Sequence, residues 1–76
     1  MTMSGTGSTR ITTSDDLGRL IRDTRKRLGL TQPQLAAASG TGVRFIVDLE
    51  RGKETARLGK ALHVLKMLGI TLLARG

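Results

Sequence analysis

The chain of 76 residues can hold one small domain with a modest core, and domains of this size are marginal alone, so that dimerisation would help. Its formal charge of +7 favours a polyanionic partner, either nucleic acid or an anionic membrane surface, while the single aromatic residue, Phe45, argues against base-stacking platforms for RNA or single strands. Zero cysteines and one histidine leave no disulfide framework, zinc site or catalytic constellation, so we expect no bound metal, no cofactor and no enzymatic activity. The sequence has no apolar stretch as long as a bilayer span and no apolar core of a signal peptide, so we expect a cytoplasmic protein that does not enter a membrane.

The N-terminal stretch up to Arg10 is rich in Ser, Thr and Gly and has almost nothing to bury, so we expect residues 1–12 to form a flexible arm. Terminal arms can reach the minor groove of DNA, and Arg10 is a candidate for such a contact. A solvated tail is the alternative, and the general mobility of chain termini favours it.

A first helix is predicted to begin near Thr13 or Ser14, with Asp15 and Asp16 in its first turn and basic residues 25–27 in its last turn, as the helix dipole prefers. Residues at helical spacing form its inner stripe: Leu17, Leu20, Ile21, Thr24 and Leu28. Four basic residues lie outside this stripe and are either solvated or in contact with phosphate: Arg19, Arg22, Arg25 and Lys26.

A second helix is predicted to begin at Thr31, whose side chain can cap it while Gln34 reaches back to the backbone N–H of the cap. Pro33 falls in the first turn, where its missing N–H would have had no partner within the helix. Gly40 ends the helix because a C-terminal cap favours the left-handed conformation. Two residues of this helix face inward: Leu35 and the small Ala36.

After a turn at Thr41 and Gly42, a third helix is predicted over residues 43–51. One side of this helix packs and carries Phe45, Ile46 and Leu49. Its other side is free and carries Val43, Arg44, Val47 and Asp48. Two short helices joined by a tight glycine turn on a strongly basic chain predict a DNA-reading device.

A final helix is predicted from about Thr55 to Leu68, with Gly69 as its cap. Its core stripe is expected to hold Leu58, Ala61, Leu62, Leu65 and Leu68. Val64 and Met67 widen the apolar arc beyond what one small core needs, which predicts a dimer interface on this helix. The one histidine, His63, is expected to lie on the polar side near Lys60 and Lys66 as an ordinary surface residue.

The last segment, residues 70–76, begins with the β-branched and apolar composition of a short strand. A lone strand cannot satisfy its own backbone groups, and no other convincing strand exists in the sequence. We therefore expect antiparallel pairing with the same segment of a second molecule, through Ile70, Leu72 and Leu73. A disordered tail is the alternative, which the apolar content disfavours.

Together these residues resemble the helix-turn-helix of the Cro/lambda-repressor-like (XRE) family. The resemblance covers roughly residues 15–68 and rests on the Leu-Gly-x-x-Ile-Arg-x-x-Arg pattern from Leu17, on Leu-Gly-Leu-Thr-Gln from Leu28, and on Ile-x-x-Leu-Glu-x-Gly-Lys from Ile46. It implies an all-α fold of about four helices over residues 13–69. Ser39 and Thr41 stand where larger apolar residues are usual, so the hydrophobic seam of the turn is expected to be thin.

A helix-turn-helix followed directly by one terminal strand is similar to the HipB-like antitoxins, and residues 44–53 resemble that branch particularly well. In that group two subunits pair their strands, and the dimer represses its own operon while holding a HipA-type serine/threonine kinase toxin. The resemblance therefore implies double-stranded operator DNA, a second copy and a HipA-like kinase as partners. The kinase is implied by the resemblance alone.

The resemblance also implies site roles. A dimer would present two recognition helices to successive major grooves of a palindromic operator. Arg44 is the first candidate for base reading, because its guanidinium group can donate two hydrogen bonds to guanine; simple phosphate contact is the alternative. Val43 and Val47 can touch thymine methyl groups or act as spacers. The residues expected at phosphate are Thr31, Gln32, Gly42, Arg51, Lys53 and Arg22. Glu50 is expected in an internal ion pair with a first-helix arginine such as Arg22.

Two other functions remain open at the level of sequence. One is a stand-alone XRE regulator with no toxin partner, which differs from an antitoxin by the lack of a neighbouring kinase-like reading frame. The other is a small protein-binding adaptor, which would lack salt-sensitive DNA binding.

Overall fold

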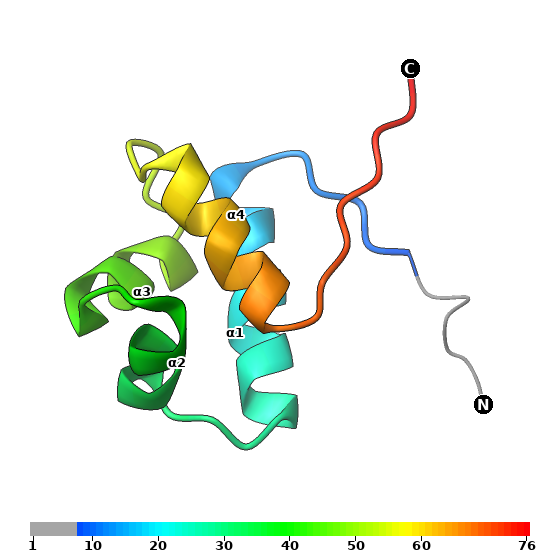
Figure 1. Cartoon of the computed structure of the whole chain (residues 1–76). Helices are drawn as coiled ribbons and strands as arrows, with labels where there is room; N and C mark the ends of the chain where they lie inside the picture. The colour runs from blue at the N-terminus through cyan, green and yellow to red at the C-terminus, as the bar shows by residue number, and fades with distance from the viewer. Residues whose placement is uncertain (1–7) are drawn as a thin grey trace.

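The computed structural model describes residues 8–76, which fold into four helices (Figure 1). The helices are α1 (Ser14–Arg27), α2 (Gln32–Ser39), α3 (Val43–Glu50) and α4 (Leu58–Met67). No strand occurs among the described residues. The predicted all-α, four-helix architecture is therefore confirmed.

Residues 1–7, which include most of the predicted N-terminal arm, lie outside the described residues. Residues 8–12 have no helix or strand, and the Arg10 side chain is exposed. The division of the chain into an arm, a domain and a terminal strand stays a prediction.

A capping box fixes the start of α1. The Thr13 hydroxyl accepts from the backbone N–H of Asp16 at 3.1 Å, and the Asp16 carboxylate accepts from the N–H groups of Thr12 and Thr13. These backbone donors hold the pKa of Asp16 below its ordinary value, with a smaller contribution from the nearby Arg19 guanidinium. The predicted N-terminus at Thr13 or Ser14 is thus correct.

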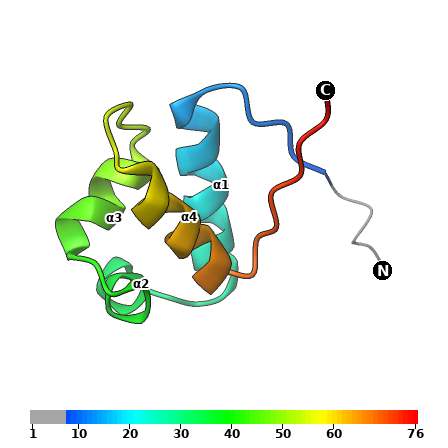
Figure 2. The same ribbon diagram turned by 45° about the horizontal axis from the view of Figure 1, so that its top comes forward.

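The core is formed where the four helices meet, as the two views in Figures 1 and 2 show. Its fully buried members come from every helix: Ile21, Leu35, Ile46, Val64 and Leu65. Such a core requires close helix contacts, and at Gly18 of α1 an added Cβ would lie 2.6 Å from the carbonyl oxygens of Leu49 and Glu50. Only glycine fits there without moving the backbone of α3.

The rotational position of α4 differs from the prediction. Val64, predicted at a dimer interface, has no exposed surface and belongs to the core, whereas Leu58 is 70% and Leu62 is 44% exposed. The buried stripe runs through Ala61, Val64, Leu65 and Leu68, which is an i, i+3, i+4, i+7 pattern. Apolar residues almost surround this helix, so several stripes were compatible with the sequence.

Two boundaries also differ. The last helix begins at Leu58 instead of Thr55, because residues 51–57 form a turn in which the Lys53 N–H donates to the Asp48 carbonyl. Leu28, expected on the inner stripe of the first helix, is the exposed C-cap residue of α1, and its N–H closes the helix on the Thr24 carbonyl.

The terminal segment leaves α4 through a left-handed turn at Gly69, where φ is 75°, as the predicted cap requires. The Ile70 N–H donates to the Leu65 carbonyl at 2.9 Å, and the Ile70 side chain packs partly against the core. Residues 70–76 then continue without helix or strand on the same side of the molecule as residues 8–12 (Figures 1 and 2). A strand needs a partner edge, which residues 8–76 of a single chain do not supply, so the pairing across a dimer stays a prediction.

Candidate nucleic-acid interface

The turn between α2 and α3 is built from two glycines with different roles. Gly40 ends α2 in the left-handed conformation with φ of 68°, and its N–H returns to carbonyls of α2. Gly42 is the N-cap of α3 with φ of −80°, a value open to any residue, and an added Cβ there would meet nothing within 4 Å. Gly40 is therefore required by the backbone. The predicted role of Gly42, close approach to DNA, stays a prediction.

The start of α2 carries the predicted capping box. The Thr31 hydroxyl accepts from the Gln34 N–H at 3.1 Å, and the Gln34 side-chain oxygen accepts from the Thr31 N–H at 2.8 Å. Since Pro33 has no N–H, Gln32 supplies the first-turn backbone donor that the cap does not use. This end of α2 thus offers a phosphate one backbone donor, fewer than the sequence suggested.

The third helix presents one apolar and one polar side, as predicted. Ile46 and Leu49 are buried against the other helices, while Val43 and Arg44 are exposed and Val47 is half-buried between them. Arg44 has 80% of its side chain in solvent. The side of α3 that faces away from the core is therefore accessible to a duplex along its first two turns.

Two further cations extend this side of α3. Arg51, the C-cap residue, is exposed, and Lys53 follows in the next turn with half of its side chain in solvent. Arg22, the remaining predicted phosphate contact, is exposed on α1. We refer to Arg44, Arg51 and Lys53, with Val43 and Val47, as the α3 reading surface.

An acidic residue lies within this basic surface. The Asp48 carboxylate holds Arg44 through an Nε–Oδ1 distance of 3.3 Å and Lys53 through an Nζ–Oδ2 distance of 3.4 Å. The sequence placed Asp48 on the free side of the helix but gave it no role. The spacing of four residues from Arg44 was the available signal, because i, i+4 side chains meet on a helix.

A buried ion pair joins α1 to the end of α3, the helix that carries the reading surface. Arg25 of α1 donates from Nε to Glu50 Oε2 at 2.6 Å and from Nη2 to Glu50 Oε1 at 3.0 Å, and both side chains are at least nine-tenths buried. The hydrogen bonds that Arg25 donates to Glu50 raise the pKa of its guanidinium further above its already high value. The predicted internal pairing of Glu50 is correct.

The predicted partner of Glu50, Arg22, was wrong. Arg22 points to solvent, whereas Arg25 continues the buried stripe of Gly18 and Ile21 at i, i+3, i+7 spacing. Arg25 was therefore also misplaced outside the inner side of α1. The spacing from Gly18 is the signal that could have identified it.

The same network reaches the candidate phosphate contact at the start of α2. Gln32 Nε2 donates to Glu50 Oε1 at 3.2 Å, and Arg25 Nη1 donates to the Leu30 carbonyl at 2.8 Å. A primary amide has two N–H donors, so one donor of Gln32 is held by Glu50 and the second can be offered to a phosphate. Three helices thus converge on one carboxylate.

The turn departs from an apolar seam at Ser39, as expected. Ser39 is 5% exposed, and its hydroxyl oxygen has no hydrogen-bond partner among residues 8–76. The Thr41 hydroxyl is likewise buried and unpartnered within the described chain. The two hydroxyl groups thus occupy buried positions at the turn where alkyl side chains would have a lower desolvation cost.

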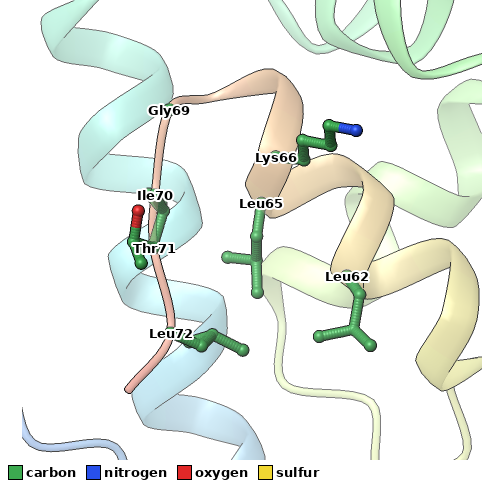
Figure 3. A pocket seen from close by; sticks show the side chains of 7 residues that line it. All are labelled: Leu62, Leu65, Lys66, Gly69, Ile70, Thr71 and Leu72. Atoms are coloured by element: carbon green, nitrogen blue, oxygen red, sulfur yellow. The ribbon is translucent and has the colours of Figure 1, made fainter.

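A second apolar surface lies at the junction of α4 and the terminal segment. Figure 3 shows Leu62 and Leu65 extending from α4 and Leu72 pointing toward them, beside a cavity of about 350 Å³, while the ammonium group of Lys66 points away. Leu72 is half exposed and Leu73 is 90% exposed, and Met67 also reaches solvent. Of the predicted dimer-interface residues, Met67, Ile70, Leu72 and Leu73 fit this surface and Val64 does not.

Two negative observations concern the described residues. None of their helices is long and apolar enough to cross a bilayer. In residues 8–76 no three His, Cys, Asp or Glu side chains gather in a way that could hold a metal ion.

Comparison with known proteins agrees with this geometry. A family model described as helix-turn-helix matches residues 21–74. An HTH-type transcriptional regulator of Sinorhizobium fredii, y4mF, is 54% identical over 69 residues, which cover 88% of this chain and 91% of that protein. An HTH-type transcriptional regulator of Methanothermobacter thermautotrophicus is 42% identical over 50 residues, which cover 66% of this chain and 72% of its own length.

Solved structures share the fold at lower sequence identity. A HipB–O4 20mer complex superimposes with a TM-score of 0.82 over 91% of this chain and 97% of that chain, at 20% identity. A HipA–HipB–O2–O3 complex gives a TM-score of 0.83 with the same coverage and identity. The predicted similarity to HipB is thus confirmed at the level of the fold.

Proposed function

Since this chain belongs to the XRE helix-turn-helix family of transcriptional regulators, we propose that it is a dimeric repressor that binds a palindromic operator and also serves as an antitoxin. The observation that carries the DNA-binding half is the α3 reading surface, where Arg44, Arg51 and Lys53 are exposed on the side opposite the buried Ile46 and Leu49. An exposed basic helix after a tight turn suits the major groove of B-DNA.

Within this proposal, Arg44 reads a guanine through two hydrogen bonds to its O6 and N7 acceptors. Val43 and Val47 lie beside it and contact thymine methyl groups or act as spacers. The residues that hold phosphates are Gln32, Thr31 through the hydrogen of its hydroxyl, Gly42, Arg51, Lys53 and Arg22. The buried Arg25–Glu50 pair supports this division of roles, because it fixes the start of α2 against the end of α3.

We propose that two copies join through the junction of α4 and residues 70–76. Met67, Leu72 and Leu73 are exposed there, and several exposed apolar side chains in one region favour a protein–protein interface. Paired strands from two tails would satisfy the backbone groups of residues 70–76 and cover these side chains together. A two-fold dimer of this kind places two α3 helices on one face, as a palindrome requires.

The antitoxin half rests on the shared fold with HipB, which in one solved structure is held in a complex with HipA and DNA. We propose that the partner of this chain is a HipA-like serine/threonine kinase. Pull-down of the tagged protein from its native cells, followed by mass spectrometry, tests this directly. Recovery of such a kinase is the expected result, and recovery of DNA without any kinase would leave a stand-alone regulator.

The DNA-binding half is tested by fluorescence anisotropy with a duplex that contains the promoter of the protein's own operon, over a range of salt concentrations. Binding should be nanomolar to micromolar and should weaken steeply with salt as counterions are displaced. The dimer is tested in the same assay with residues 70–76 deleted, together with sedimentation analysis. Salt-insensitive binding would contradict a DNA-binding role, and a truncated protein that remained dimeric at low concentration would contradict the tail-mediated dimer.

A further inference from the structure

Asp48 places a negative charge in the middle of a surface that otherwise suits a polyanion. Its carboxylate lies on α3 four residues after Arg44 and is about one-fifth exposed. A carboxylate near DNA is repelled by phosphates, so this position has a cost for binding that is independent of sequence. An equivalent neutral side chain would avoid that cost.

Both oxygens of this carboxylate are engaged in the free protein. Oδ1 faces the Arg44 guanidinium at 3.3 Å, and Oδ2 faces the Lys53 ammonium at 3.4 Å. Arg44 and Lys53 are also the residues to which the proposed function gives a base contact and a phosphate contact, and both side chains are exposed. Any DNA that takes these two cations away leaves Asp48 without its partners.

We propose that Asp48 is a specificity-determining residue of the α3 reading surface, which disfavours DNA in general and favours operator sites that present a base amino group to its carboxylate. This inference rests on the proposed DNA-binding function. In the major groove, cytosine N4 and adenine N6 are amino donors, whereas guanine O6 and N7 and thymine O4 are acceptors. A carboxylate is an acceptor only and therefore pairs with the first group and is repelled by the second.

The neighbouring arginine has the opposite preference. The guanidinium of Arg44 has donors only, so it favours guanine acceptors. Because Arg44 and Asp48 are adjacent on one helix face, the pair is matched by a guanine acceptor beside a cytosine or adenine amino group. On non-operator DNA one member of the pair faces a group of the wrong kind.

The contribution of Asp48 can be separated from that of net charge with a matched variant. Asp48→Ala removes one negative charge and its acceptor oxygens from the reading surface, and Asp23→Ala removes the same group from the exposed side of α1. Both variants raise the formal charge of +7 by one. Circular dichroism and thermal unfolding of both variants should match the unmodified protein, since Asp48 and Asp23 lie outside the core.

The probes are a random-sequence duplex and the site that the unmodified full-length protein enriches from a randomised duplex library. Affinities for both probes are measured at one salt concentration. Asp48→Ala should tighten binding to the random duplex by about threefold to tenfold and reduce the ratio of the two affinities by about tenfold, the size of one base contact. Asp23→Ala should leave that ratio unchanged. A repeated selection with Asp48→Ala should lose the preference for cytosine or adenine at one position in each half-site, because alanine has neither a donor nor an acceptor in its side chain.

Asp48→Ala and Asp23→Ala with equal affinity ratios would overturn the proposal, as would a selection by Asp48→Ala that returns the same site. Failure of the proposed function itself has a different signature, because the unmodified protein would then enrich no site. A loss of selectivity that accompanied a large fall in unfolding temperature would assign Asp48 to stability and would also overturn the specificity role.

Discussion

The guanidinium of Arg25 and the carboxylate of Glu50 form a two-point contact between α1 and the end of α3, with N–O distances of 2.6 and 3.0 Å. Glu50 also accepts from Gln32, so this buried contact connects the start of α2 with the reading helix. The position of the α3 reading surface relative to the α2 N-terminus therefore depends on a pair that is buried beneath the surface.

Glu50→Gln should destabilise the fold by about 3 kcal/mol or more, because it leaves the buried Arg25 guanidinium without a counter-charge. The measurement is urea denaturation followed by circular dichroism. Replacement of both partners, with Arg25→Met and Glu50→Leu, should recover part of that loss, since neither charge then remains buried. A double variant less stable than Glu50→Gln would show that the hydrogen bonds to Leu30 and Gln32 matter more than the charge.

Gly18→Ala should destabilise the protein by about 1 to 3 kcal/mol, because its Cβ would press on the carbonyl oxygens of Leu49 and Glu50 and push α1 from α3. Gly59→Ala is the matched control, since Gly59 lies on the exposed side of α4 with nothing within 4 Å of an added Cβ. That change should stabilise the protein by about 0.5 to 1 kcal/mol through helix propensity. The unfolding temperature should fall for Gly18→Ala and rise for Gly59→Ala. An unchanged unfolding temperature for Gly18→Ala would mean that α1 and α3 separate easily.

Arg44→Ala should reduce operator affinity by about 1 to 3 kcal/mol and relax the sequence preference at one base pair, whereas Lys53→Ala should weaken all sequences evenly. The physical difference is that a base edge carries sequence information and a phosphate does not. Affinities for operator and random duplexes, measured at matched salt, distinguish the two residues. Equal losses on both duplexes for Arg44→Ala would assign Arg44 to phosphate.

Asp16 gives the protein a pH dependence at low pH. Its pKa is lower in the folded than in the unfolded chain, so its stabilising contribution is complete above an ordinary carboxyl pKa of about 3.9 and is lost as the pH falls through the lower folded value. Asp16→Asn should therefore lower the unfolding temperature at pH 7, and the difference from the unmodified protein should shrink towards pH 2. A difference that stayed constant with pH would mean that the contribution of Asp16 does not depend on the charge of its carboxylate.

Much of the fold follows from local chemistry that is legible in the sequence. The caps at Thr13 and Thr31 and the left-handed turns at Gly40 and Gly69 depend on a few neighbouring residues, and the structure has them where the sequence predicted them. The polar and apolar sides of α3 also follow from one clear periodicity. These features could be predicted because each is decided within about one helical turn.

The errors concern choices that only tertiary packing decides. Apolar residues at Leu58, Leu62, Val64 and Met67 allow α4 more than one rotational position, and contact with α2 selects the one that buries Val64. Arg22 and Arg25 carry the same side chain three residues apart, so the choice of partner for Glu50 depended on the axial rotation of α1. For the DNA contacts the sequence provided candidates by type and position, and Asp48 became informative only with its two ion pairs in view.

The turn at Gly69 has a consequence for operator length. Its left-handed φ and the bond from the Ile70 N–H to the Leu65 carbonyl set the direction in which the terminal segment leaves α4. In a dimer joined through that segment, this direction would determine how far apart the two α3 helices lie. The spacing between operator half-sites would then be encoded at a glycine far from any base, and a one-residue insertion after Gly69 would change the preferred spacing while leaving each half-site sequence as it was.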